Sequence, residues 1–136
     1  MTEYNKPLPD VTDPEVAPFW EGTKKQELRI RRCKQCGKYQ WPPRPMCAYC
    51  HSLELEWVKA VGKGVLYTYT IGQRALHPGF KDDIPYGLVV IELAEGPHMI
   101  GNSSGIKPEE LEIGMPMSAV FDNVTEQVTL VKWKPA

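Results

Sequence analysis

The chain has 136 residues, of which 42% are hydrophobic, and a formal net charge of −1 at pH 7. This composition suits one compact unit, or two small ones that share a core, and excludes a disordered chain. The longest apolar run, about residues 88–91, falls far short of the roughly 20 residues that cross a membrane, and the N-terminus lacks the pattern of a secretory signal, so we expect a cytoplasmic protein without membrane contact.

Residues 12–23 have the pattern of an amphipathic helix. Thr12 and Glu15 have the spacing of a capping box, and Pro14 suits a first helical turn. The apolar face follows helical spacing through Val16, Phe19, Trp20 and Thr23. The two aromatic residues of this face either pack within the chain or bind a partner subunit.

The four cysteines form two Cys-x-x-Cys pairs: Cys33 with Cys36, and Cys47 with Cys50. This spacing lets four thiolates converge on one zinc ion, as in a rubredoxin-like zinc ribbon. Gly37 follows the first pair, where the backbone must turn sharply behind the second sulfur. Because four thiolates fill the coordination shell, the zinc is expected to be structural. Iron stays open, since such knuckles accept either metal.

Other roles for these cysteines fit less well. Disulfides need an oxidising compartment, which the expected location does not provide. Residues 47–51 also match the Cys-x-x-Cys-His pattern of haem attachment, but that requires export and leaves the first pair without a role. A thioredoxin-like site uses a single Cys-x-x-Cys pair. We therefore favour zinc.

A basic stretch surrounds the first pair. Residues 29–44 contain no acid and six basic side chains, Arg29, Arg31, Arg32, Lys34, Lys38 and Arg44. These side chains, with Tyr39 and Trp41 between them, suit nucleic acid. The same side chains would also offset the charge of about −2 on a tetrathiolate zinc. A third interpretation is that they bind an anionic cofactor such as the phosphates of coenzyme A. Charge alone does not separate these interpretations.

The rest of the chain is mainly β. Five barrel strands are predicted at residues 65–71, 86–93, 98–103, 116–123 and 128–133, with a helical turn at 108–111 between the third and fourth. A bend or bulge at 62–64 would join them to an extended stretch at 54–61. The layout predicts a five-stranded OB-fold barrel. We expect an N-terminal helical segment at 1–30, a zinc ribbon at 31–52 and the OB-fold domain at 53–136.

Motifs along nearly the whole chain also suggest a family. They are Asp13-Pro14, Pro18-Phe19-Trp20-Glu21-Gly22, Arg32-Cys33-x-x-Cys36-Gly37, Pro42-Pro43-Arg44-Pro45-x-Cys47-x-x-Cys50, Tyr67-x-Tyr69-Thr70, Gly101-Asn102 and Ile113-Gly114-Met115-Pro116. Together they resemble the zinc-ribbon and OB-fold proteins formerly described as a domain of unknown function and associated with acyl-CoA metabolism. The four cysteines match that family's zinc ligands one by one.

The resemblance implies a non-catalytic accessory subunit. Such proteins form hetero-oligomers with thiolase-superfamily enzymes, including thiolases and lipid-transfer-protein-like aldolases, that act on acyl-CoA thioesters. They scaffold the enzyme and in some cases help to hold coenzyme A or the acyl chain. No local nucleophile and base pair is visible, since His51, His77 and His98 stand apart from any Ser, Cys or Asp constellation. Catalytic groups would come from the partner.

The segment 77–85 is predicted to be an exposed loop between two strands, and OB folds use such loops for recognition. We hypothesise that His77 and Phe80 contact the acyl-CoA or the partner enzyme. The alternative is that Phe80 only covers the end of the barrel.

A different class of function is a single-stranded nucleic-acid-binding protein. The ribbon with an OB fold and the basic aromatic stretch favour it. The acids spread through the barrel half weaken it, because a polyanion needs a cationic surface. Those acids are Asp82, Asp83, Glu92, Glu95, Glu109 and Glu110.

Overall fold

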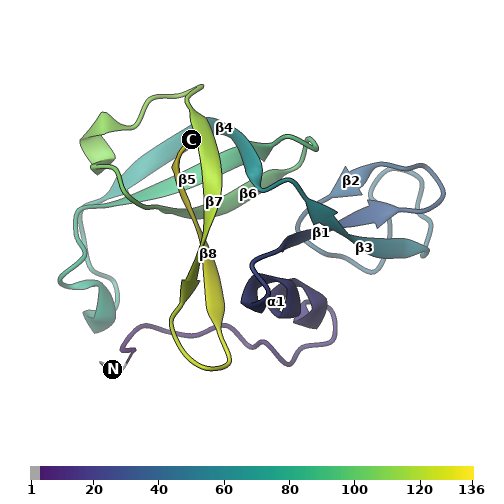
Figure 1. The fold of residues 1–136 in the computed structure, drawn as a ribbon, viewed down its shortest axis with the longest axis horizontal. Coiled ribbons are helices and arrows are strands. Elements are labelled where there is room, and N and C mark those ends of the chain that lie inside the picture. The colour runs from purple at the N-terminus through teal and green to yellow at the C-terminus, as the bar shows by residue number, and fades with distance from the viewer. Residues whose placement is uncertain (1–3) are drawn as a thin grey trace.

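A computed structural model describes residues 4–136 and shows one helix, two small β-structures and two single-turn 3₁₀ helices (Figure 1). The ribbon half contains α1 (Ala17–Lys24), β1 (Leu28–Cys33), β2 (Tyr39–Gln40) and β3 (Leu55–Ala60). The barrel half contains β4 (Lys63–Gly72), η1 (Pro78–Phe80), β5 (Tyr86–Leu93), β6 (His98–Ser103), η2 (Pro108–Glu110), β7 (Pro116–Asn123) and β8 (Thr129–Pro135).

The ribbon contains a three-stranded antiparallel sheet in the order β2-β1-β3. Arg31 of β1 pairs with Gln40 on one side, and Leu28 pairs with Ala60 on the other. The stretch expected at 54–61 therefore forms the third ribbon strand. This sheet crosses both expected domain limits, at 30/31 and at 52/53, because β1 starts before the first and β3 lies beyond the second. The division into 1–30, 31–52 and 53–136 stays a prediction.

The second half closes into a five-stranded barrel in the order β4-β5-β6-β8-β7. β6 and β8 run parallel, with Asn102 opposite Lys132, and all other neighbouring barrel strands are antiparallel. η2 lies between the third and fourth barrel strands, where the sequence predicts a helical turn. The prediction of a mainly β chain with a helix, a zinc ribbon and an OB-type barrel is confirmed.

The first barrel strand, β4, does not alternate strictly between inward-facing and outward-facing side chains. Its pairing with β5 shifts between Leu66 and Thr68, so that Tyr67 forms a bulge. Leu66 is fully buried and Tyr67 is half exposed, whereas Tyr69 packs against the core. Strict alternation over residues 65–71 would put Val65, Tyr67, Tyr69 and Ile71 on one face, and the structure does not, because a bulge resets the alternation. The predicted bend is present as a left-handed turn at Gly62, with φ of 79°.

The helix begins at Ala17, and the predicted capping box is wrong. Thr12 donates from its backbone N–H and its hydroxyl to Asp10 Oδ1, at 2.9 and 2.6 Å. The Glu15 N–H binds Asp13 Oδ1 at 3.0 Å. These aspartate-centred turns satisfy the backbone donors before the helix starts. Within residues 4–136 no helix has the length and apolar character needed to span a membrane.

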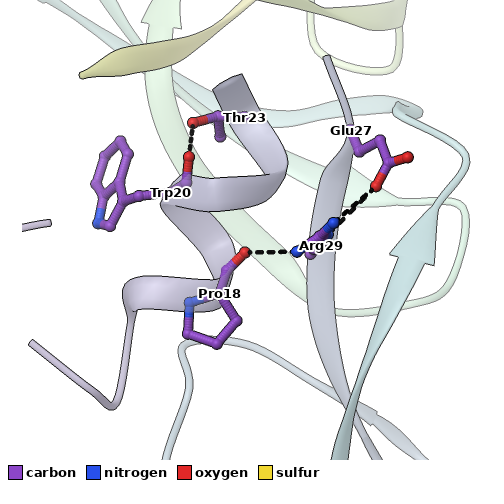
Figure 2. A network of polar contacts seen from close by, with 5 residues as sticks. All are labelled: Pro18, Trp20, Thr23, Glu27 and Arg29. Atoms are coloured by element: carbon purple, nitrogen blue, oxygen red, sulfur yellow. Dashed lines mark hydrogen bonds and ion pairs between the residues drawn. The ribbon is translucent and has the colours of Figure 1, made fainter. Parts of the chain in front are cut away.

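α1 is fastened to the first ribbon strand by Arg29 (Figure 2). The guanidinium donates to the Pro18 carbonyl oxygen at 3.3 Å and binds the Glu27 carboxylate at 3.2 Å. Gly22 permits this approach, because a Cβ there would come within 2.7 Å of the Arg29 side chain. In Figure 1, α1 lies between the ribbon sheet and the barrel.

A single hydrophobic core joins the two halves. The cluster includes Phe19 of α1 and Ile30 of β1 together with Leu66, Val89 and Trp133 of the barrel. The Phe19 ring lies 4.9 Å from the ring of Trp20 and 4.7 Å from that of Trp41, between centroids. The aromatic pair of the helix thus packs within this chain, which was one of its two expected roles.

Candidate metal centre and binding surfaces

The four cysteines converge at the end of the ribbon. Cys33 ends β1, and their Sγ atoms all lie within 4.8 Å of one another. The Sγ atoms of Cys33 and Cys50 are 3.6 Å apart, and those of Cys36 and Cys47 are 3.7 Å apart. Tetrahedral zinc with Zn–S bonds of about 2.3 Å sets its sulfurs about 3.8 Å apart. The donor set and its spacing fit a tetrathiolate zinc.

The two knuckles have matching backbones. Gly37 has φ of 77° and donates to the Cys33 carbonyl oxygen at 2.9 Å; His51 has φ of 63° and donates to the Cys47 carbonyl oxygen at 3.1 Å. The sharp turn predicted at Gly37 is present. His51 occupies the corresponding position after the second pair and is therefore a turn residue of the knuckle.

Backbone N–H groups stabilise the thiolates. The Cys36 N–H, 3.4 Å from Cys33 Sγ, is the main cause of a lowered Cys33 pKa. Burial raises the Cys47 pKa, but hydrogen bonds from the N–H groups of Cys50 and Tyr49 outweigh it and bring the pKa to about 6. The Ser52 N–H lowers the Cys50 pKa, yet burial and the neighbouring thiols raise it to about 12. Metal-free, the cluster therefore retains protons that a metal ion displaces.

Gln40 makes a hydrogen bond to one of the cysteine ligands, a contact that the sequence did not reveal. Its buried amide Nε2 donates to Cys47 Sγ at 3.1 Å, and its Oε1 accepts from the Ala48 N–H at 3.0 Å. Such contacts orient a metal ligand and tune its basicity. The spacing of the cysteines identifies only the metal ligands. Gln40 is not a ligand, so no sequence pattern pointed to it.

Several members of the basic stretch contact ribbon aromatics. Arg31 lies over Trp57 at 4.9 Å, Arg32 over Tyr39 at 5.7 Å and Lys38 over Tyr49 at 4.3 Å, measured to the ring centroid. Trp41 packs on Phe19, and Arg29 fastens α1. The cations and aromatics of this stretch therefore pack on one another and on α1 and have structural roles in the ribbon half.

The predicted loop, between β4 and β5, lies on the side of the barrel away from the ribbon sheet (Figure 1). Phe80 lines a groove of about 460 Å³, and its ring centroid lies 5.8 Å from that of Tyr86. His77 is not among the lining residues; its Nδ1 accepts from the Gly79 N–H at 2.9 Å and so caps η1. The loop is partly covered by the N-terminal segment, where Lys6 pairs with Asp83 at 2.7 Å.

A wider cleft of about 710 Å³ separates the ribbon from the turn between β5 and β6. Lys38, Arg44 and Tyr49 line the ribbon side, and Glu95 and His98 line the barrel side. Glu95 Oε2 accepts from the Val61 N–H at 2.9 Å. Its Oε1 is buried and has no hydrogen-bond partner among residues 4–136.

One of the histidines that stand alone in the sequence gains neighbours in the fold. His98 Nε2 lies 3.5 Å from Glu92 Oε2, and its ring centroid lies 4.2 Å from that of Tyr67. Cross-strand pairing of β5 with β6 and the bulge at Tyr67 bring these side chains together.

Comparison with known proteins now assigns the chain to a family. Residues 20–56 match the rubredoxin-like zinc ribbon domain of ChsH2, and residues 57–122 match its C-terminal OB-fold domain. The chain belongs to the ChsH2 (DUF35) family. Its cysteine quartet is therefore the structural zinc site of a zinc ribbon, consistent with the sulfur geometry.

Three relatives illustrate the range of this family. The solved structure "Ltp2-ChsH2(DUF35) aldolase" is 32% identical with a TM-score of 0.82, covering 96% of this chain and 98% of that chain. A "DUF35 domain-containing scaffold protein" from Methanocaldococcus jannaschii is 37% identical over 84% of this chain and 82% of its own length. A "Probable enoyl-CoA hydratase alpha subunit" from Thermomonospora curvata is 36% identical over 87% of this chain, which spans only 37% of that relative.

We predict that Gln40→Glu lowers zinc affinity roughly 10- to 100-fold, the usual cost of losing a hydrogen bond to a metal ligand. The substitution removes the N–H donor to Cys47 Sγ and adds a negative charge beside an anionic cluster. Competition with a chromogenic chelator measures the affinity. Gln35→Glu is the matched control, because it adds the same charge at an exposed position in the first knuckle. Equal affinities of the two variants would contradict the role given to Gln40.

Proposed function

We propose that this chain is a non-catalytic accessory subunit that scaffolds an acyl-CoA-processing enzyme of the thiolase superfamily, a thiolase or a lipid-transfer-protein-like aldolase. The observation that carries the proposal is the end-to-end likeness to the ChsH2 (DUF35) component named in an aldolase structure, with 96% of this chain aligned. Relatives named scaffold protein and hydratase alpha subunit support the same class of role.

The metal centre supports a structural role. Four thiolates complete a tetrahedral shell and leave no position for water or substrate, so the zinc holds the ribbon and does not act on a carbonyl group. Four thiolates also require a reducing compartment, and we propose a cytoplasmic location on that ground.

The groove beside Phe80 is the proposed contact with the acyl-CoA or with the enzyme. Phe80 and Tyr86 give it an aromatic wall, and Asn102, Ser103 and Ser104 give it polar groups. His77 caps the helical turn that carries Phe80, so its role is to position that ring. A pantetheine or acyl chain is a ligand of matching chemistry, with apolar and amide portions.

The direct experiment is purification of the tagged chain from its native cells under mild conditions, followed by mass spectrometry. We expect a stoichiometric thiolase-superfamily enzyme. Single-stranded DNA or RNA that binds with a steep salt dependence, in the absence of any acyl-CoA enzyme, would contradict the proposal and favour the nucleic-acid alternative.

For the groove, we predict that Phe80→Ala lowers kcat/KM of the purified complex for its acyl-CoA roughly tenfold, because a contact of aromatic size is worth about 1.5 kcal/mol or more. Leu76→Ala is the control, since Leu76 lies in the same loop and is highly exposed. His77→Ala should act in the same direction by releasing η1. Unchanged kinetics in the Phe80→Ala and His77→Ala variants, with zinc content and complex intact, would overturn the assignment of the groove.

A further inference from the structure

The outer surface of β4, β5 and β6 carries an apolar patch whose members are neighbours by strand register. Val90 of β5 pairs with Thr68 on one side and with Ile100 on the other. Leu88, two residues from Val90 on the same face of β5, pairs with Thr70 and with Asn102. We call Tyr67, Thr68, Leu88, Val90 and Ile100 the barrel face.

The members of the barrel face point away from the core. Val89, Ile91 and Met99 are buried, so the residues that alternate with them in β5 and β6 face outward. Ile100 is 69% exposed, Tyr67 is 51% exposed and Leu88 is 38% exposed. The bulge sets Tyr67 on the same side, over His98.

This composition is unusual for the solvated side of a sheet, where polar residues normally alternate with buried ones. Single exposed apolar side chains are common, but a group joined across three strands marks an interaction site. In OB folds the surface over the second and third strands, here β5 and β6, is a frequent binding face.

The charge pattern selects the kind of partner. Within β4, β5 and β6 the only fixed charges are Lys63 and Glu92, and both lie at the end of the barrel face where Glu92 pairs with His98. A nucleic acid needs several cations along its path, and this face offers none between its apolar residues. An uncharged centre with charges at its rim is the anatomy of a protein interface.

We infer that the barrel face is the docking surface for the partner enzyme subunit, with Ile100 and Tyr67 as its anchors. The partner contributes an apolar patch and a basic side chain that meets the Glu92 carboxylate, since among residues 4–136 the one group within ion-pair distance of Glu92 is the half-exposed His98. This inference rests on the proposed function and adds to it the surface through which the enzyme is held.

The test uses the enzyme that co-purifies with the wild-type chain, identified by mass spectrometry and then produced separately. Its affinity for the full zinc-loaded chain is measured by calorimetry. Ile100→Glu should weaken binding roughly 30-fold or more, because a charge at an apolar anchor is left desolvated and unpaired. Ile113→Glu is the matched control, since Ile113 is 68% exposed in the segment before β7.

A smaller substitution keeps the test valid if the charged variant misfolds. Ile100→Ala removes only the contact and should weaken binding roughly tenfold, with unchanged zinc content and thermal midpoint. Glu92→Lys should weaken binding more at low salt than at high salt, because it sets like charges against each other. Unchanged affinity in the Ile100 variants would overturn the inference.

The outcomes also separate this inference from the proposed function. If the wild-type chain captures no acyl-CoA enzyme, the proposed function fails and the inference fails with it. If it captures the enzyme and the Ile100 variants bind as tightly as Ile113→Glu, only the docking surface is wrong. A wild-type dimer that Ile100→Glu converts to a monomer, with enzyme binding unchanged, would assign the face to a second copy of the chain.

Discussion

The ribbon depends on the convergence of four thiolates on one point. Cys33 lies at the end of β1, but Cys47 and Cys50 lie in a segment with no strand of its own. Local backbone bonds tie this segment down at few places, such as the Cys47 N–H to the Ser52 carbonyl oxygen at 2.8 Å and the Lys34 N–H to the Glu54 carbonyl oxygen at 2.9 Å. A lobe of this size buries too little apolar surface to order such a segment, so the metal supplies the missing free energy of folding.

The metal acts on the barrel through α1 and the shared core. β1 carries Arg29 against α1 near its first residue, Ile30 in the common cluster and Cys33 at its last residue. A shift of the knuckle would therefore move β1 relative to the barrel. The cleft between ribbon and barrel, and the orientation of the barrel face to the ribbon, depend on the same strand. In an accessory subunit this rigidity has a function, since a scaffold must present its contact surfaces in a fixed arrangement.

The sequence predicts those parts of this structure that depend on local chemistry. Paired cysteines and a glycine after the first pair indicate the knuckle, and alternating apolar residues indicate the barrel strands. The features that it missed depend on contacts across the chain. Gln40 reaches Cys47 only because β2 lies beside β1, and His98 meets Tyr67 and Glu92 only through strand pairing and a bulge. The helix start was misplaced because Asp10 and Asp13 satisfy the donors that a capping box would take.

A closed shell of four thiolates makes the metal structural and not catalytic, and this is the central point to test. X-ray absorption at the metal K edge of the protein as isolated tests it most directly, because the edge identifies the element and the fine structure counts the ligands. We expect zinc with four sulfur neighbours at about 2.3 Å and no lighter ligand. A nitrogen or oxygen neighbour, or fewer than four sulfurs, would contradict the account, since an open position would allow the ion to bind water or substrate.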